Sequence, residues 1–309
     1  MRSNRQIGIL IVLLGNVLFS AKAIFAKLIY QYDVDPTTLL TLRMAFSLPI
    51  YLIVAIISRR RKPDLQISKK DWINLLIFAF LGYYGASLLN FMGLLYITAG
   101  LERLILFSYP TMVVVLGAIF YKVPITSRQI LALVLTYFGI AIVFIPALPE
   151  AGPGFALGTA LVFGSALAFA IYLIRVGKYI QRFGTGLYTS YVMVLATGMI
   201  FVHFLLTRDF SVLVLPWKVY GLFLLLAIFS TVIPVFLISE GIRRIGASDT
   251  SIVASVGPVA TIVLANIFLS EPVTGIQIFG TAFVLAGVWF VSRAKEPPAD
   301  PEAMENRVR

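Results

Sequence analysis

The sequence predicts an all-α integral membrane protein in which ten transmembrane helices form two inverted five-helix repeats. Three observations lead to this prediction. Of the 309 residues, 60% are hydrophobic and 13% are charged, whereas a soluble domain carries about 25% charged residues. Ten segments are long and apolar enough to cross a bilayer, and part of the second half of the chain repeats the first.

Each predicted span holds about 20 largely apolar residues, which is the length a helix needs to cross the hydrocarbon layer. Turn residues separate most of the spans, as at Asp35-Pro36 and Glu271-Pro272. The charged, proline-rich segment 293–309 is expected to be a disordered cytoplasmic tail. The predicted spans are residues 7–29, 37–57, 73–95, 100–121, 129–147, 155–175, 186–206, 217–240, 249–269 and 275–292.

The first span also has features of a secretory signal. Arg2 and Arg5 precede its apolar run, and residues 21–23 offer a small-residue cleavage pattern. The internal repeat favours a retained helix, because it needs this segment as its first member.

The distribution of basic residues predicts the orientation. With the N-terminus inside, cytoplasmic segments hold 19 of the 25 Lys and Arg residues, including the cluster 59–62. The external loops and their edges hold three, namely Arg103, Arg208 and Lys218. This asymmetry predicts a multi-pass protein of the cell (inner) membrane with both termini in the cytoplasm. The net charge of +11 comes from short clusters between apolar stretches, so a nucleic-acid partner is not expected.

The residue inventory excludes several kinds of chemistry. The sequence has no cysteine, and His203 is its one histidine, placed near the outer end of the seventh span. Thiolate sites, cysteine nucleophiles and histidine clusters are therefore excluded. The sequence predicts no catalytic residue, no metal site and no cofactor.

The internal repeat has a register of 148 residues. Ten of the thirty positions from 110 to 139 are identical to their counterparts, among them Pro110 and Pro258 and also Gly139 and Gly287. The chain therefore divides into halves at 1–147 and 152–292. Because five spans are an odd number, the second half enters the membrane from the opposite side. Inverted repeats of this kind typify secondary transporters; a duplicated structural bundle without transport is the alternative.

These residues resemble the drug/metabolite transporter superfamily, and specifically its EamA type. The resemblance covers nearly the whole chain before Arg293, and it implies ten helices, cytoplasmic termini, a central cavity and, usually, export of amino acids or other metabolites. Two departures stand out: Val123 lies where the second half has Glu271, and Lys22 is not part of the family pattern. The block that carries the resemblance is Pro258, Phe268, Glu271-Pro272-Val273-Thr274, Gln277, Gly280 and Gly287.

Three cations lie within or at the edge of the predicted spans. Lys22 is past the midpoint of the first span, where a charged side chain costs about 2.5–3.5 kcal/mol. It is expected either to attract a substrate carboxylate or phosphate, or to extend its ammonium to the outer interface. Lys27, closer to the outer end, is the better candidate for such an extension. Arg43, two turns into the second span, is expected to bind an anion or to form a structural ion pair.

The helical phase supplies the other candidates. Asn16 and Ser20 share a face of the first span with Lys27, and Glu102 and Tyr109 are expected to share a face of the fourth. Aromatic rings with a few amides and hydroxyls suit an amphipathic ligand, although each residue could instead serve helix packing. The predicted charge network is Lys27, Arg43, Glu102 and Glu240. The predicted substrate-binding residues are Lys22, Asn16, Ser20, Tyr83, Asn90, Tyr109, Phe169, Tyr172, Phe236 and Ser255.

The predicted function is secondary transport of small metabolites such as amino acids by alternating access, in the export direction. The expected ligand is a zwitterion or anion, because cations near the predicted path outnumber Glu102 and Glu240, and membrane lipid is the expected surrounding partner. An intramembrane enzyme is one alternative, but it would need an acid/base pair at depth, and the two glutamates are placed near opposite faces. A channel would need rings of like residues or a filter.

Overall fold

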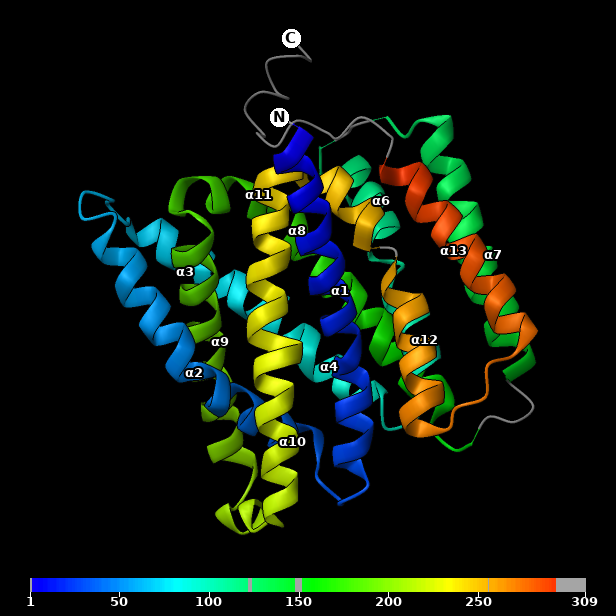
Figure 1. Ribbon diagram of the computed structural model, residues 1–309, viewed down its shortest axis with the longest axis horizontal. Helices are drawn as coiled ribbons and strands as arrows, with labels where there is room; N and C mark the ends of the chain where they lie inside the picture. The colour runs from blue at the N-terminus through cyan, green and yellow to red at the C-terminus, as the bar shows by residue number, and fades with distance from the viewer. Residues whose placement is uncertain (1, 122–123, 148–151, 255, 293–309) are drawn as a thin grey trace.

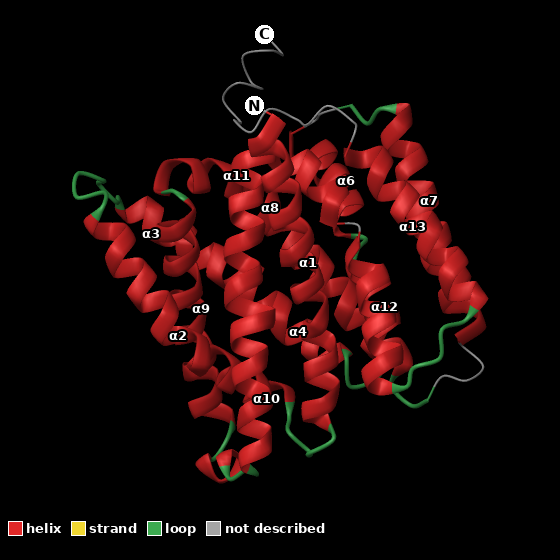
Figure 2. Cartoon of the chain, in the orientation of Figure 1, coloured by secondary structure: helices red, strands yellow, loops and turns green. Residues whose placement is uncertain are grey.

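The computed structural model describes residues 2–121, 124–147, 152–254 and 256–292, and within these ranges the chain forms helices and loops but no strand (Figure 2). Eight helical segments of this described part are long and apolar enough to cross a membrane. Two shorter apolar helices follow them, Val256–Leu269 and Gly275–Phe290. The chain is therefore a multi-pass helical membrane protein. The tail predicted at 293–309 lies outside the described residues.

In chain order the elements are α1 (Arg2–Tyr30), α2 (Pro36–Arg60), α3 (Lys69–Phe78), η1 (Ala79–Gly85), α4 (Ala86–Gly93), α5 (Ala99–Leu106), α6 (Tyr109–Tyr121), α7 (Ser127–Ala147), α8 (Phe155–Phe183), α9 (Thr185–Thr207), η2 (Phe210–Leu213), α10 (Trp217–Ala227), η3 (Ile228–Val232), α11 (Ile233–Ala254), α12 (Val256–Leu269) and α13 (Gly275–Ser292).

The two halves of the chain are interleaved. Helix α1 packs against α11 and α12, and α2 packs against α9 (Figure 1). Helices α7 and α13 lie side by side at one edge of the molecule, while α2, α3 and α9 form the opposite edge. Each of the first-half helices α1, α2, α4 and α5 therefore packs against at least one helix of the second half.

Two predicted boundaries were wrong because polar residues continue a helix instead of ending it. The span predicted at 155–175 extends to Phe183, where Gly184 ends α8 with a φ of 77°. The segment after 240 was expected to be a loop, but α11 runs on to Ala254. Ion pairs from Glu240 to the arginines three and four residues later stabilise that continuation.

The fourth predicted span is broken in the structure. Helix α5 ends at Leu106, and α6 begins at Tyr109. Pro110 explains the break, because proline has no N–H to donate to the carbonyl of Leu106. The prediction that Glu102 and Tyr109 share one face of a continuous helix was therefore wrong.

Two of the long spans contain a π-helical segment, η1 in Lys69–Gly93 and η3 in Trp217–Ile245. The 148-residue register carries 79–85 onto 227–233, so the two segments occupy equivalent places in the two halves. π-Helical turns are rare in proteins, and those that do occur are often found at functional sites. Because such a segment occurs at equivalent positions of the two halves, both segments are candidates for the functional site.

Helices α7 and α13 approach closely because glycines line their contact. A Cβ atom added at Gly139 would lie 2.5 Å from the carbonyl oxygen of Gly280, and one added at Gly280 would lie 2.6 Å from that of Gly139. Small residues allow such backbone contact in membrane helices. The glycines of the repeated sequence block therefore have a packing role.

Ion pairs join the two halves at opposite ends of the molecule. Arg208 Nε lies 3.0 Å from Asp35 Oδ1, at the end where the α1–α2 turn meets the start of the α9–α10 connection. Asp35 also caps α2 by accepting from the N–H groups of Thr37 and Thr38. Burial acts to raise the pKa of the Asp35 carboxyl, but hydrogen bonds from Thr38 and Arg208 prevail and lower it.

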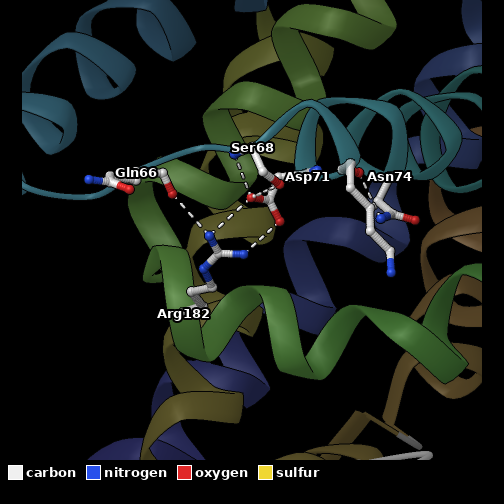
Figure 3. Close-up of polar contacts among 6 residues, drawn as sticks. Gln66, Ser68, Asp71, Asn74 and Arg182 are labelled. Carbon is white, nitrogen blue, oxygen red and sulfur yellow. Dashed lines mark hydrogen bonds and ion pairs between the residues drawn. The ribbon is translucent and has the colours of Figure 1, made fainter.

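At the other end, Arg182 and Asp71 make a two-pronged pair (Figure 3). Arg182 Nη1 lies 2.6 Å from Asp71 Oδ1, and Nη2 lies 3.0 Å from Oδ2. Asp71 also accepts from the backbone N–H and hydroxyl of Ser68, which completes a capping box at the start of α3. Arg182 Nη2 reaches the carbonyl of Gln66 in the preceding loop. One carboxylate thus fixes the α3 terminus, its loop and the end of α8.

Replacing Asp71 by alanine is expected to lower the free energy of unfolding by about 1–2 kcal/mol, because the capping bonds and the partner of Arg182 are lost together. The loss is measured as a lower midpoint of thermal unfolding of the purified protein. Asp64→Ala is the control, since Asp64 is exposed on the adjacent loop. Equal midpoints for the two variants would show that the Asp71 contacts do not stabilise the fold.

Candidate functional site

A buried polar network centres on Lys22. The side chain is 6% exposed, and its Nζ donates to Asn90 Oδ1 at 2.7 Å. Asn90 Nδ2 in turn donates to Glu102 Oε1 at 2.5 Å, so the network connects α1, α4 and α5. Of the two interpretations of Lys22, the structure favours a side chain held inside the protein over one extended to the interface.

Two arginines flank Lys22 across aromatic rings. The Phe91 ring lies 5.5 Å from Lys22 Nζ and 5.4 Å from the guanidinium carbon of Arg43. The Phe19 ring lies 5.3 Å from Lys22 Nζ and 5.3 Å from that of Arg103. Three cations thus alternate with two rings, and ring quadrupoles favour cations at these distances.

Arg103, placed by the sequence at the edge of an external loop, was not predicted to be buried. It is 3% exposed, in the second turn of the span Ala99–Phe120. Thr98 caps α5 by accepting from the N–H of Leu101, so the helix begins within one residue of its predicted start. A basic residue so close to a predicted span end carries no clear signal of burial.

The π-helical segment η3 is bonded to Arg43. Its Nε donates to Thr231 Oγ1 of η3 at 2.8 Å, and that hydroxyl donates to the carbonyl of Leu226 at 3.0 Å. Tyr83 of η1, which the 148-residue register aligns with Thr231, lies within electrostatic range of the guanidinium. Arg43 of the first half is therefore bonded to the π-helical segment of the second half. Thr231 could not be recognised from the sequence, because a single threonine in an apolar helix is common.

The charges of this cluster are not balanced. Lys22, Arg43 and Arg103 face the single carboxylate of Glu102, and no ion pair within 4.0 Å joins any of them to an acidic residue in the described part of the chain. Three buried atoms of this cluster have no hydrogen-bond partner among the described residues: Arg43 Nη1, Arg103 Nε and Glu102 Oε2. Unpaired buried charge is costly, and a ligand that met these atoms would offset that cost.

Aromatic side chains extend from this cluster. The Tyr83 and Tyr172 hydroxyls lie 3.3 Å apart, Phe169 stacks on Tyr172 at 5.5 Å, and Tyr109 meets Phe169 edge-on at 5.3 Å. The structure therefore brings together four of the predicted aromatic residues. Phe236 lies against Tyr51 instead, with ring centroids 5.8 Å apart.

Ser20 takes part in helix packing, whereas Asn16 bonds within its own helix. Ser20 Oγ donates to the carbonyls of Asn16 at 2.7 Å and Gly257 at 3.0 Å, which ties α1 to α12. Asn16 Nδ2 donates to the carbonyl of Val12 at 2.9 Å. Of these bonds, only that from Ser20 to Gly257 is interhelical, and it is the packing role that the sequence left open as an alternative. Ser255, predicted as a ligand contact, lies outside the described residues.

The two remaining members of the predicted charge network, Glu240 and Lys27, have different partners. Glu240 pairs with Arg243 and Arg244 of its own helix, both at 2.6 Å, so it is occupied away from Lys22. Lys27 is half-buried and lies within electrostatic range of Glu271 and Glu102. Glu271 itself accepts from the N–H of Ala99 at 3.0 Å and caps the start of α5.

A separate pocket of about 620 Å³ lies at the α2–α3 loop. It is formed largely by surface-loop residues, whereas the buried charges lie elsewhere, and we take the charged cluster as the functional candidate. The pocket is lined by Arg59, Pro63, Asp64, Leu65, Gln66, Ile67, Trp72 and Tyr191.

A helical bundle with a buried, polar and charged centre is the arrangement of a membrane transporter. Comparison with known proteins is in agreement. The EamA-like transporter family matches twice, at residues 6–145 and 156–293, and this chain belongs to that family.

Relatives from bacteria and archaea match nearly end to end. An uncharacterized transporter of Bacillus subtilis, YcbK, is 28% identical, covering 94% of this chain and 92% of its own length. An uncharacterized transporter of Archaeoglobus fulgidus is 26% identical, with 84% and 90% covered. A solved crystal structure shares the fold, with a TM-score of 0.65 at 15% identity, and covers 92% of this chain and 95% of its own.

Proposed function

We propose that this transporter is a secondary transporter that carries a small organic molecule bearing an anionic group, either an anion or a zwitterion. The observation that carries the proposal is the buried excess of cations at Lys22, Arg43 and Arg103 around one carboxylate. Tyr83, Tyr172 and Phe169, beside the cluster, supply the apolar surface that an organic ligand needs.

The proposed mechanism is alternating access between two inverted five-helix halves, in the export direction. Two observations support it: the family matches twice along the chain, and Arg43 of the first half is bonded to Thr231 of the second. Cations contributed by α1, α2 and α5 are held by partners from both halves, so a rocking motion would alter their surroundings. Substrate or ion gradients would supply the energy.

Flux into liposomes tests the function. The purified protein is reconstituted, and a mixture of labelled metabolites is followed for accumulation inside, chemical conversion and ionic current. Saturable accumulation of an anionic or zwitterionic solute is expected. Conversion of a solute without accumulation would point to an enzyme instead, and a steady current would point to a channel.

We also propose that both termini and the 59–70 loop face the cytoplasm of the cell (inner) membrane, while Asp209 is external. Because the chain has no cysteine, single cysteines can be introduced and labelled with an impermeant reagent on intact cells. Asp209→Cys is expected to react at once, and Arg61→Cys only after the cells are opened. Strong labelling of Arg61→Cys from outside would contradict the orientation.

A further inference from the structure

The buried cluster has more positive charge than a singly charged ligand would neutralise. Lys22, Arg43 and Arg103 are 6%, 4% and 3% exposed, and Glu102 is fully buried. Their formal charges leave two positive charges in excess among the described groups of the cluster. Lys27 does not add to this excess, because Glu271 lies within its electrostatic range.

The excess positive charge is also spread over several side chains of the cluster. Lys22 is already bonded to Asn90, and each of the two rings that it contacts also contacts one arginine. The unpaired donors are on the arginines, Arg43 Nη1 and Arg103 Nε, and both are buried. The free hydrogen-bonding capacity for an anion is thus divided between α2 and α5.

A zwitterion would satisfy these groups incompletely. Its ammonium could meet Glu102 Oε2, which has no partner in the described residues, and its carboxylate could meet one arginine. The zwitterion brings no net charge, however, so the two excess positive charges would remain in a low-dielectric surrounding. A ligand with two negative charges removes the excess.

We propose that the site binds a doubly charged anion, a dicarboxylate or a phosphate monoester, with Arg43 and Arg103 as the residues that distinguish it from singly charged analogues. This inference rests on the proposed function and specifies its substrate class. Arg103 becomes a specificity-determining residue, a role that its place in the sequence did not suggest.

Four probes test the proposal with the full-length protein in detergent. Succinate carries two carboxylates, butyrate carries one on the same four-carbon chain, and 4-aminobutyrate has an ammonium in place of the second. Glycerol phosphate places both charges on one group. Apparent dissociation constants come from the rise in the unfolding midpoint with probe concentration at fixed ionic strength. Succinate or glycerol phosphate is expected to bind at least about tenfold more tightly than butyrate and 4-aminobutyrate.

Variants of the two arginines test whether these residues cause the preference for doubly charged probes. Arg43→Gln and Arg103→Gln are each expected to reduce the preference for the doubly charged probe by about tenfold. Arg61→Gln removes an exposed charge and is expected to leave the preference unchanged. Arg43→Lys and Arg103→Lys keep the charge and are expected to retain most of the preference; they also serve if the glutamine variants fail to fold.

Several results would overturn the proposal. One is binding of 4-aminobutyrate or butyrate as tightly as the doubly charged probes, and another is an unchanged preference in both glutamine variants. If none of the four probes binds, the proposal is also rejected. The proposed function is judged separately, because flux of any anionic or zwitterionic metabolite into liposomes sustains it whichever way these ratios fall.

Discussion

Replacing Lys22 by methionine is expected to reduce the initial rate of substrate uptake into liposomes by about 10- to 100-fold. Lys22 Nζ holds Asn90, and through it Glu102, while sharing rings with both arginines. A hydrogen bond to a charged group contributes about 1.5–3 kcal/mol, and 1.4 kcal/mol corresponds to a factor of ten. Methionine fills similar space but can neither donate to Asn90 nor contribute charge to the ligand.

The control for this variant is Lys70→Met, which removes a lysine from the exposed start of α3. It is expected to transport at the unmodified rate. Both variants are first compared for membrane insertion and for elution as a single species, so that a folding defect is recognised. Uptake kinetics of Lys22→Met that match those of Lys70→Met would limit Lys22 to a structural role.

The second large effect is expected on stability, at the contact between α7 and α13. Gly139→Leu places side-chain atoms where the Gly280 carbonyl and the Phe283 Cβ already lie, 2.5 and 2.9 Å from the added Cβ. Backbone atoms cannot rotate away as a side chain can, so the helices must separate. The expected cost is about 3 kcal/mol or more. It is measured as a lower midpoint of thermal unfolding in detergent.

Gly198→Leu gives a matched comparison, because it also replaces a helical glycine by leucine. A Cβ atom at Gly198 meets nothing within 4 Å, and the residue is exposed on α9. Its midpoint is expected to stay equal or rise slightly, since leucine favours the helix more than glycine does. If the two variants unfold at the same temperature, the close approach of α7 and α13 is not a source of stability.

The sequence could predict two kinds of feature: the membrane class, and the polar or charged residues that lie within apolar spans. The membrane class followed from composition, and the structure places Lys22, Arg43, Asn90 and Glu102 together as buried groups. Those residues were recognisable because a polar side chain deep in a span must have a partner.

Other parts of the site depended on where helices break or continue, which a prediction that assumes regular, unbroken helices does not include. The break before Pro110 changed the direction of Tyr109, and the continuation of α11 kept Glu240 with its own arginines. Phe19 and Phe91 were missed because a phenylalanine in a membrane helix has many possible roles. Arg103 was missed because a basic residue in the first turns of a span usually extends to the membrane interface.

The paired π-helical segments bear on the history of the chain. A π-helical turn holds one residue more than the α-helical turn it replaces, so it can arise by insertion of a residue into an existing helix. Two independent insertions would have no reason to fall at matching places, yet η1 and η3 do. A single insertion in an ancestral half, copied when that half was duplicated, would account for the match. The residues at the two turns differ, with Tyr83 in one and Thr231 in the other.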